Sequence, residues 1–373
     1  MKILELTHYT AGSCGVGKRV LNEAKMLARH KHKVRIFSSN LVKGSSRACP
    51  KFEKIGKIQI TRFPAVKLGG ETFISWKFEQ EAKNFNPDII IAHAYRHIHT
   101  IRALKIARKL HIPCLLVTHA PFKRERSRTL IQNLSVKLYD LLIGRRTLKK
   151  FDKVLIIAPW EIDYLLKLGV PRHKIIYSPN GVDISFFKRK KKGPKSKSII
   201  YTGRISPIKN LEVLIGSMIF IDENFNLLIY GPAENNYLVK LNNLIIKNNL
   251  QKRVSIINKE YGIKKQLELL DKSEIFVLPS KSEGMPQSLI EAMARGKIVV
   301  GSNIHSISSI IKDKYNGFTF KENSSEDLAK KINLAINLSP KDKYKVSKEA
   351  IESVKKFKWP SIINDLNNLI KND

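Results

Sequence analysis

Short apolar runs alternate with helical patterns along the 373 residues of the chain, and this alternation constrains the fold more than any other feature. The first apolar run, Lys2–Leu6, is followed by a glycine-containing loop, a helical pattern over Val20–Ala28 and a second apolar run, Lys33–Phe37. Strands that alternate with helices predict a doubly wound parallel sheet, which binds ligands at the carboxyl ends of its strands.

A basic segment, Lys188–Lys197, divides this alternation into two halves. No core could bury so many charges, so we place a linker at 184–197 and one domain on either side of it, 1–183 and 198–345. The length and an apolar content of 43% suffice for two cores. We therefore expect an α/β protein with two Rossmann-like, doubly wound parallel-sheet domains that face a cleft.

The expected elements can be given by range. The further strands of the first domain are Lys57–Phe63, Asp88–Ala92, Pro113–Thr118, Val154–Ala158 and Lys174–Tyr177. The strands of the second domain are Ser198–Tyr201, Asn226–Tyr230, Val254–Ile257, Ile275–Leu278, Ile298–Gly301 and Gly317–Phe320. Helical patterns cover Ile98–Leu110, Glu161–Leu168, Asn235–Asn248, Lys264–Leu270, Ser288–Arg295, Asp327–Leu338, Val346–Phe357 and Pro360–Ile370.

The chain is strongly basic, with 68 lysines and arginines against 32 acidic residues and a net charge of +36. Such a charge attracts polyanions, either nucleic acid or an anionic membrane surface, although a lysine-rich surface that is only solvated explains it equally well. The sequence contains no recognisable nucleic-acid-binding module and no ladder of aromatic residues, which disfavours nucleic acid as the partner.

Residues 123–150 interleave basic and apolar side chains, and only Glu125 and Asp140 oppose the positive charge. This pattern predicts a long basic amphipathic helix, which either lies on anionic lipid or packs on the sheet with a solvated basic face. Its basic residues are Lys123, Arg124, Arg126, Arg128, Lys137, Arg145, Arg146, Lys149 and Lys150.

Other features of the sequence bear on location. No apolar run approaches the roughly 18–20 residues that a membrane span needs, and Glu5 interrupts the first apolar run, unlike a signal peptide. Cys14, Cys49 and Cys114 are far apart, which indicates a reducing compartment and no metal cage. We expect a cytoplasmic protein, with a peripheral position on the inner membrane face as the alternative to a purely soluble one.

The loop after the first strand has its glycines in the spacing GxxGxG, not in the GxGxxG of a dinucleotide-binding loop. Gly12–Lys18 also matches the GxxxxGK of a P-loop, but Arg19 stands where a Ser or Thr hydroxyl should bind Mg²⁺. A loop in which Gly15 or Gly17 lets the backbone approach a phosphate, or simply forms one wall of a cleft, fits better than a P-loop NTPase.

The segment Pro279–Glu291 leads from an apolar run into a helical pattern. Pro286 suits the first turn of that helix, so Glu283 should lie in the loop and Glu291 inside the helix. Backbone N–H groups between these glutamates would form an anion site at the positive end of the helix dipole, with a carboxylate on either side to bind hydroxyl groups. A phosphate flanked by polyols describes a nucleotide sugar.

Two cations follow the first strand of the second domain. Arg204 can bind a diphosphate with two hydrogen bonds, and Lys209 can act as a point charge. Together they could stabilise a departing nucleoside diphosphate without a metal.

Histidines follow two strands of the first domain. His119 stands at the carboxyl end of Pro113–Thr118, where open α/β sheets bind their ligands. His93, His97 and His99 crowd the end of the preceding strand. No cysteine or carboxylate at a useful spacing completes a metal site, so we expect these three histidines to line a cleft instead.

Taken together, these motifs resemble family 4 of the retaining nucleotide-sugar glycosyltransferases, which has the GT-B fold. The tail around Phe357–Trp359 resembles the last helix of that family, so the helices in 346–373 are expected to cross back to the first domain. The matching segments are Tyr201–Arg204 with Lys209, Pro279-Ser280 with Glu283-Gly284, the E-x7-E of Glu283 and Glu291, Glu291–Ala294 with Gly296, Asn316-Gly317, Ser178–Asp183 and, more loosely, Gly12–Gly17 with His119.

The resemblance implies a role for each matching residue. Glu291 would bind the ribose hydroxyls, and Arg204 and Lys209 would hold the diphosphate. Gly15 or Gly17 would approach the phosphates, and His119 would face the acceptor and the reacting carbon. The donor sugar would be held by Glu283 and by the backbone of Gly284, Met285, Pro286, Gln287 and Ser288.

The implied reaction is front-face transfer, with retention, of a hexose-type sugar from a UDP- or GDP-sugar to a glycan or lipid-linked acceptor. It would need no metal and no cofactor, the nucleotide sugar being a co-substrate. The catalytic group would consist of His119, Glu283, Arg204 and Lys209. A sugar-nucleotide epimerase of the same fold is the alternative, and a P-loop NTPase is a weaker one.

Overall fold

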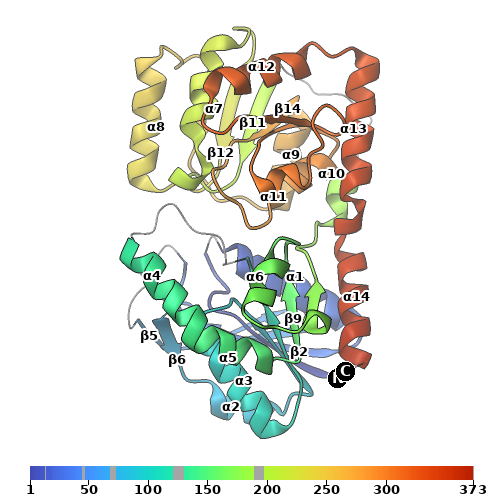
Figure 1. Cartoon of the computed structure of the whole chain (residues 1–373). Helices are drawn as coiled ribbons and strands as arrows, with labels where there is room; N and C mark the ends of the chain where they lie inside the picture. The colour runs from blue at the N-terminus through green and yellow to red at the C-terminus, as the bar shows by residue number, and fades with distance from the viewer. Residues whose placement is uncertain (13, 44–46, 68–72, 121–129, 189–196, 373) are drawn as a thin grey trace. The chain divides into compact units, whose positions relative to one another are not determined.

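The computed structural model describes residues 1–373 except 13, 44–46, 68–72, 121–129, 189–196 and 373. Its contacts divide the chain into two compact units. Unit 1 comprises Met1–Gly181 and Trp359–Asp373, and unit 2 comprises Val182–Lys358. Each unit is α/β and is built on its own predominantly parallel sheet, as predicted (Figure 1).

The main sheet of unit 1 has the strand order β10-β9-β8-β7-β1-β2-β4-β3, and all its pairings are parallel except β3 with β4. A short antiparallel pair, β5 with β6, lies outside this sheet. The strands are β1 Lys2–Leu6, β2 Lys33–Ser39, β3 Phe52–Ile55, β4 Ile58–Phe63, β5 Ala65–Lys67, β6 Ile74–Trp76, β7 Ile89–His93, β8 Cys114–Val117, β9 Lys153–Ile156 and β10 Ile175–Tyr177.

The order of these strands places the carboxyl ends of β1 and β7 at a topological switch point. From β1 the chain fills the sheet in one direction through β2, and then returns to add β7 on the other side of β1. Ligands of open α/β sheets bind where the order reverses in this way. In unit 1 that point lies beside Glu5 in β1 and His93 at the end of β7.

Helices cover both faces of the unit 1 sheet. They are α1 Gly15–Arg29, α2 Glu79–Phe85, α3 Ile98–Leu110, α4 Leu130–Tyr139, α5 Arg145–Thr147, α6 Glu161–Lys167 and α14 Trp359–Asn372. The last helix, α14, packs against α1, and a hydrogen bond of 2.8 Å joins His32 Nε2 to Asn367 Oδ1 (Figure 1).

The predicted single helix over residues 123–150 is wrong for the part that the structure describes. Residues 123–128, with their basic side chains and Glu125, lie outside the described residues. After α4 the chain forms a π-helical turn, Asp140–Gly144, and then α5 and a 3₁₀ turn, Leu148–Lys150. A Cβ on Gly144 would lie 1.9 Å from Tyr95 Oη, so close packing at this turn coincides with the interruption of the helix.

The sheet of unit 2 is entirely parallel, with the order β13-β12-β11-β14-β15-β16. Its strands are β11 Ser198–Thr202, β12 Asn226–Tyr230, β13 Val254–Ile257, β14 Ile275–Leu278, β15 Ile298–Ser302 and β16 Phe318–Phe320. Its helices are α7 Leu211–Ser217, α8 Asn235–Lys247, α9 Ile263–Lys272, α10 Gln287–Ala294, α11 His305–Ser308, α12 Ser325–Ile336 and α13 Pro340–Val354. The order reverses between β11 and β14, which places a second switch point there.

The two ends of unit 2 differ from the predicted domain boundaries. At its start, Ile184–Phe187 forms a 3₁₀ turn that belongs to unit 2, and residues 189–196 of the predicted linker lie outside the described residues. At its end, α13 packs against α10, and Ser347 Oγ donates a hydrogen bond to Gly296 O. The chain therefore returns to unit 1 at Trp359 rather than at 346.

No helix among the described residues is both long enough and apolar enough to cross a membrane.

Candidate active site

The switch point of unit 2 brings together the two segments that the sequence singled out. Arg204 and Lys209 follow β11, and Glu283 follows β14, the strand beside it in the sheet. A backbone hydrogen bond of 2.9 Å from Lys281 N to Ile208 O ties the two segments to each other. The parallel pairing of β11 with β14 therefore explains why residues far apart in the sequence meet at one edge.

Lys209 and Glu283 form an ion pair, with 2.6 Å between Nζ and Oε1. Ser280 Oγ donates a second hydrogen bond of 2.6 Å to the same carboxylate oxygen. The side chains of Lys209 and Glu283 are only 17% and 10% exposed. The sequence assigned these residues separately to phosphate and sugar, and the structure shows that they also fix each other in place.

Arg204 is held less firmly. Its side chain is 47% exposed, and Nη1 lies 3.6 Å from Glu234 Oε1. The backbone around it is tight, because Tyr201 Oη donates to Arg204 O at 2.8 Å and a Cβ on Gly231 would lie 1.9 Å from Gly203 O. Glycine is therefore required at position 231, where φ is +153°, and the loop that carries Arg204 is fixed although its guanidinium is not.

The helix α10 carries Glu291 as predicted. Pro286 is its N-cap rather than a residue of its first turn, so the helix begins at Gln287, and Gln287 N donates to Met285 O at 2.9 Å. Gln266 Nε2 donates to Glu291 Oε2 at 2.6 Å, which orients this carboxylate. Gly284 and Ser288 flank this turn and are half-buried.

In unit 1 the structure separates the two candidate glycines of the first loop. A Cβ on Gly17 would lie 2.5 Å from Tyr9 O, whereas a Cβ on Gly15 would meet nothing within 4 Å. Gly17 is buried and its amide is bonded to Cys14 Sγ, the N-cap of α1, at 3.4 Å. Gly17 is therefore required for packing, and Gly15, which is exposed, is the one that a ligand can approach.

Arg19, the residue that breaks the P-loop pattern, is buried. Its guanidinium bonds Glu23 Oε2 at 3.0 Å, Ser178 O at 2.7 Å, Ser178 Oγ at 2.9 Å and Asn180 Oδ1 at 3.1 Å. It thereby holds α1 to the segment after β10. A side chain with this structural task cannot replace the hydroxyl that a P-loop presents to Mg²⁺, which argues against the NTPase alternative.

His119 lies at the carboxyl end of β8 as predicted, and a chain of hydrogen bonds extends from it into the sheet. Its Nε2 is 3.1 Å from His93 Nδ1, and His93 Nε2 is 2.7 Å from Glu5 Oε2. Burial lowers the pKa of His93 to about 4, and Arg19 adds to this shift. Burial raises the pKa of Glu5 to about 8, although Arg19 opposes that shift. Glu23 partly offsets the shift of His93. Burial also lowers the pKa of His119 well below its ordinary value, so all three groups are uncharged at pH 7.

The backbone at His119 is strained and is held by a buried carboxyl. His119 and Ala120 have φ values of +60° and +54°, which residues other than glycine rarely adopt. Glu161 Oε2 accepts a hydrogen bond of 3.1 Å from Ala120 N and another from Thr118 Oγ1. Its Oε1 accepts from the amides of Ile157 and Ala158. Glu161 thus joins the ends of β8 and β9, and burial raises its pKa to about 7 against these hydrogen bonds.

Of the three histidines that were predicted to line a cleft, His93 and His99 are buried, so the prediction is wrong for both. His99 is buried in α3, stacks on Trp76 and His8, and bonds His93 O at 2.8 Å. His97 is half-buried and bonds Tyr95 O at 3.1 Å. The prediction is therefore wrong for His99, because the 3.6-residue period of α3 turns it toward the sheet.

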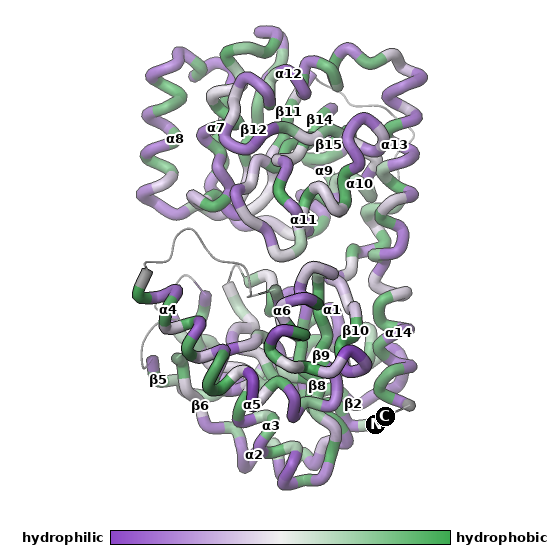
Figure 2. Tube along the Cα trace, viewed as in Figure 1, coloured by the Kyte–Doolittle hydropathy of each residue, from purple (hydrophilic) through white to green (hydrophobic). Residues whose placement is uncertain are grey.

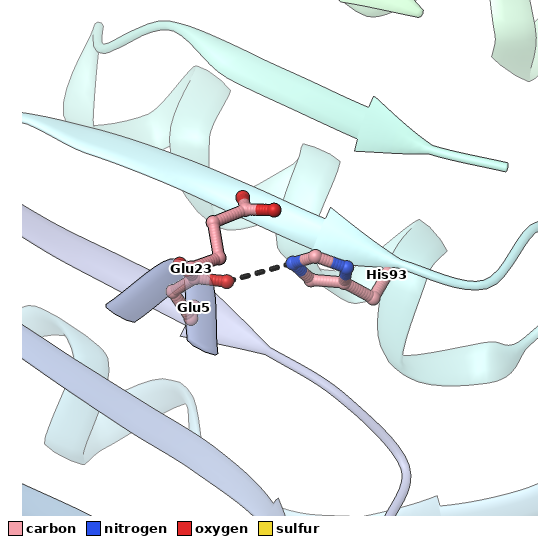
Figure 3. Close-up of side chains that lie close together, drawn as sticks. All are labelled: Glu5, Glu23 and His93. Atoms are coloured by element: carbon pink, nitrogen blue, oxygen red, sulfur yellow. Dashed lines mark hydrogen bonds and ion pairs between the residues drawn. The ribbon is translucent and has the colours of Figure 1, made fainter. Parts of the chain in front are cut away.

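Glu5, Glu23 and His93 converge in the interior of unit 1 (Figure 3). One ligand atom from each lies within 4.8 Å of the others, so these three could in principle surround a cation. However, Arg19 already bonds Glu23, and His93 Nε2 already bonds Glu5. A guanidinium beside the carboxylates repels a metal ion, so we interpret the cluster as a hydrogen-bond network.

Comparison with known proteins identifies the class of enzyme. Residues 14–186 match the model of Glycosyltransferase Family 4, and residues 183–354 match that of Glycosyl transferases group 1. The two matches together cover most of the chain. The chain therefore belongs to the family 4 (group 1) glycosyltransferases and has the GT-B fold.

Individual proteins are similar to it at lower identity. An uncharacterized glycosyltransferase of Methanocaldococcus jannaschii is 27% identical over 262 residues, which are 69% of this chain and 68% of the relative. The UDP-Gal:alpha-D-GlcNAc-diphosphoundecaprenol alpha-1,3-galactosyltransferase of Escherichia coli is 29% identical over 58% of each chain. The structure of Anabaena HepE in complex with UDP and glucose has a TM-score of 0.74 at 16% identity over 100% of both chains, a likeness of fold alone.

Sequence reasoning missed the buried ionisable residues behind His119, namely Glu5, Glu23, Arg19 and Glu161. One signal was available. Glu5 stands inside an apolar run that is buried in the middle of a parallel sheet, and such strands are otherwise nearly continuous in apolar residues. The hydrogen-bond partners of these residues come from other strands, so no local pattern predicts them.

Proposed function

We propose that this glycosyltransferase moves a hexose-type sugar, with retention, from a UDP- or GDP-sugar to a glycan or lipid-linked acceptor, without a metal. The observation that carries the proposal is the Lys209–Glu283 pair at the switch point of unit 2, with Arg204 on the adjacent loop. Two cations beside carboxylates suit a diphosphate that is flanked by hydroxyl-rich groups.

In this proposal each candidate residue has one task. Arg204 and Lys209 neutralise the diphosphate as its negative charge develops, and Glu291, oriented by Gln266, accepts hydrogen bonds from the ribose hydroxyls. Glu283 and the amides of Gly284 and Ser288 hold the donor sugar, and Gly15 lets the backbone of its loop approach a phosphate. The leaving phosphate takes the proton of the acceptor hydroxyl on the face from which it departs, and His119 faces that acceptor.

The names of similar proteins support both substrates of the proposal. The galactosyltransferase of Escherichia coli is named for a UDP-sugar donor and a diphosphoundecaprenol-linked acceptor, and HepE was crystallised with UDP and glucose. A sugar-nucleotide epimerase of the same fold remains the alternative. It differs in turning over a nucleotide sugar when no acceptor is present.

The test begins with nucleoside diphosphate binding in the presence of EDTA. We expect either UDP or GDP to raise the melting temperature, because a ligand at about 100 times its Kd stabilises by about 2.7 kcal/mol. The matching nucleotide sugars are then screened with a polyprenyl-diphosphate sugar as acceptor, and the anomer of the product is read by NMR. Lack of any binding and transfer would refute the proposal, an inverted anomer would refute retention, and turnover without acceptor would indicate the epimerase.

We further propose that unit 1 docks on an anionic membrane surface through α4 and the π-helical turn after it. Asp140 does not oppose the positive charge there, because Arg96 Nε and Tyr95 Oη bond its Oδ1 at 2.8 and 2.9 Å. Hydrophobic positions recur along α4 (Figure 2). The exposed apolar side chains, between 42% and 81% exposed, are Ile131, Leu134, Leu138, Leu141, Leu142 and Ile143. The exposed basic side chains of the same stretch are Lys137, Arg145, Arg146, Lys149 and Lys150.

A flotation experiment tests this surface. We expect the protein to float with phosphatidylglycerol-containing vesicles at low salt and to be released as salt screens the basic side chains. The triple variant Leu134→Ser, Leu138→Ser and Leu141→Ser should reduce binding at least tenfold, since each loses apolar area that the lipid would cover. Val239→Ser with Ile246→Ser on α8, which are 59% and 58% exposed, is the matched control. Failure of the unaltered protein to float would contradict the proposal.

A further inference from the structure

Two hydrogen bonds connect His119 to a carboxyl in the middle of the unit 1 sheet. The residues come from three strands that are neighbours in the sheet: Glu5 from β1, His93 from β7 and His119 from the end of β8. Glu5 and His93 are fully buried, and His119 is half-buried. Because Nε2 of His119 is bonded to His93 at 3.1 Å, Nδ1 is the ring nitrogen of His119 that remains for a ligand.

The two distances fit two arrangements of hydrogen atoms, because each imidazole has one donor and one acceptor nitrogen when neutral. In the first arrangement a protonated Glu5 donates to His93 Nε2, His93 Nδ1–H donates to His119 Nε2, and His119 carries its hydrogen on Nδ1. In the second, an ionised Glu5 accepts from His93 Nε2–H, His93 Nδ1 accepts from His119 Nε2–H, and Nδ1 of His119 is bare. The state of Glu5 thus decides whether His119 offers a donor or an acceptor.

The charges around Glu5 favour the first arrangement. Arg19 and Glu23 compensate each other in a buried ion pair, with side chains 1% and 0% exposed. An ionised Glu5 would add a second, uncompensated negative charge to this interior, which is costly. Burial raises the pKa of Glu5 to about 8 even though Arg19 opposes the shift. Of the other titratable groups nearby, His97 acts on His119 and lowers its pKa, and His99 Nε2 lies 2.8 Å from the backbone oxygen of His93.

We propose that Glu5 and His93 are positioning residues that keep a hydrogen on Nδ1 of His119, so that His119 serves as a hydrogen-bond donor and not as a base. This inference rests on the role proposed above for His119 and specifies it. A donor at this position can bind an oxygen of the acceptor or of the transferred sugar. It cannot remove the proton of the acceptor hydroxyl, which leaves that task to the departing phosphate.

Ionisation of Glu5 reverses the chain with a balanced transfer of hydrogens. The hydrogen on Glu5 moves to His93 Nε2, the hydrogen on His93 Nδ1 moves to His119 Nε2, and the hydrogen on His119 Nδ1 leaves to water. One proton is released and both imidazoles stay neutral. Ionisation of Glu5 therefore releases a proton from Nδ1 of His119. Above about pH 8, Nδ1 of His119 no longer carries a hydrogen and cannot donate a hydrogen bond.

Enzyme kinetics provide the first test. For the unaltered protein we expect kcat to fall roughly tenfold between pH 7 and 9, as the donor form is lost with a single pKa near 8. Glu5→Gln, whose amide can still donate to His93, should remove this alkaline fall. Glu5→Leu should lower kcat at pH 7 by about tenfold or more with little change in KM for the nucleotide sugar. Glu81→Gln, at an exposed position, should behave like the unaltered protein. A persistent alkaline fall in Glu5→Gln would overturn the proposal.

Nitrogen NMR of histidine-labelled full-length protein is the second test and needs neither activity nor a variant of Glu5. The signals of His119 are assigned from their loss in His119→Gln. We expect Nδ1 to carry the hydrogen at pH 7 and the tautomer to change near pH 8. A hydrogen on Nε2 at pH 7, or conversion to imidazolium near pH 6–7, would refute the inference. Absence of transferase activity at every pH would instead refute the proposed function.

Discussion

Replacement of Lys209 by alanine is expected to lower kcat/KM for sugar transfer by about 10²–10³, which is the usual loss when one group that stabilises developing charge is removed. Lys209 is fixed by its 2.6 Å contact with Glu283, and its side chain is only 17% exposed. A preorganised cation in a partly dry site acts strongly on a diphosphate, because water screens it little. Removal of Lys209 therefore weakens the stabilisation of the departing diphosphate in the transition state more than it weakens binding of the nucleotide sugar. The fall should appear mainly in kcat.

Initial rates at saturating acceptor, with released nucleoside diphosphate as the readout, measure this effect. Lys343→Ala is the matched control, because Lys343 forms a comparable 2.7 Å pair with Glu274 in unit 2 and its side chain is 31% exposed. It should keep nearly full activity. Lys209→Arg should retain part of the activity, since it keeps the charge but not the compact geometry. A Lys209→Ala enzyme within threefold of the unaltered rate would exclude Lys209 from the diphosphate site.

The fold was predictable because parallel sheets leave a strong local signal. Strands buried on both faces are continuous apolar runs, so β1, β7 and β14 were located to within about a residue. The strands that the sequence did not reveal are β3, β5 and β6. β3 and β5 are largely exposed, so burial did not give them a continuous apolar composition. β6 is buried at Ile74 and Trp76, but its three residues are too few to form a recognisable apolar run.

Residues of the candidate site could be predicted from the sequence only where they directly follow a predicted strand. Arg204 and Glu283 were found because each follows a predicted strand, and the strand order then brought them together. The pairing of Lys209 with Glu283 and the choice of Gly15 over Gly17 depend on contacts between distant segments. The helix over 123–150 failed for the same reason, since Asp140 and Gly144 meet Tyr95, which lies beyond the end of β7.

Arg19→Met should destabilise unit 1 by about 3–5 kcal/mol at pH 8, because it leaves the buried carboxylate of Glu23 without its cation. It also removes the hydrogen bonds to Ser178 that hold α1 to the segment after β10. All three tryptophans, Trp76, Trp160 and Trp359, lie in unit 1, so urea unfolding followed by tryptophan fluorescence reports on this unit.

The pH dependence of this loss separates a buried charge from lost packing. Burial and Glu5 raise the pKa of Glu23, and Arg19 opposes them, so removal of Arg19 raises that pKa further. A group with a raised folded-state pKa destabilises the fold as pH rises, because ionisation in the interior becomes unavoidable. The loss should therefore be small near pH 4.5 and largest at pH 8.

The double variant Arg19→Met with Glu23→Met should recover most of the stability, since replacement of a whole buried pair by apolar side chains is often neutral. Arg29→Met, an exposed position on the same helix, should stay within about 0.5 kcal/mol. A loss in Arg19→Met that is the same at every pH would mean that the hydrogen bonds to Ser178, and not the charge of Glu23, make position 19 a structural residue. In either case the guanidinium of Arg19 makes its hydrogen bonds inside unit 1. Position 19 therefore supplies no hydroxyl for Mg²⁺, and the loop before it cannot act as a P-loop.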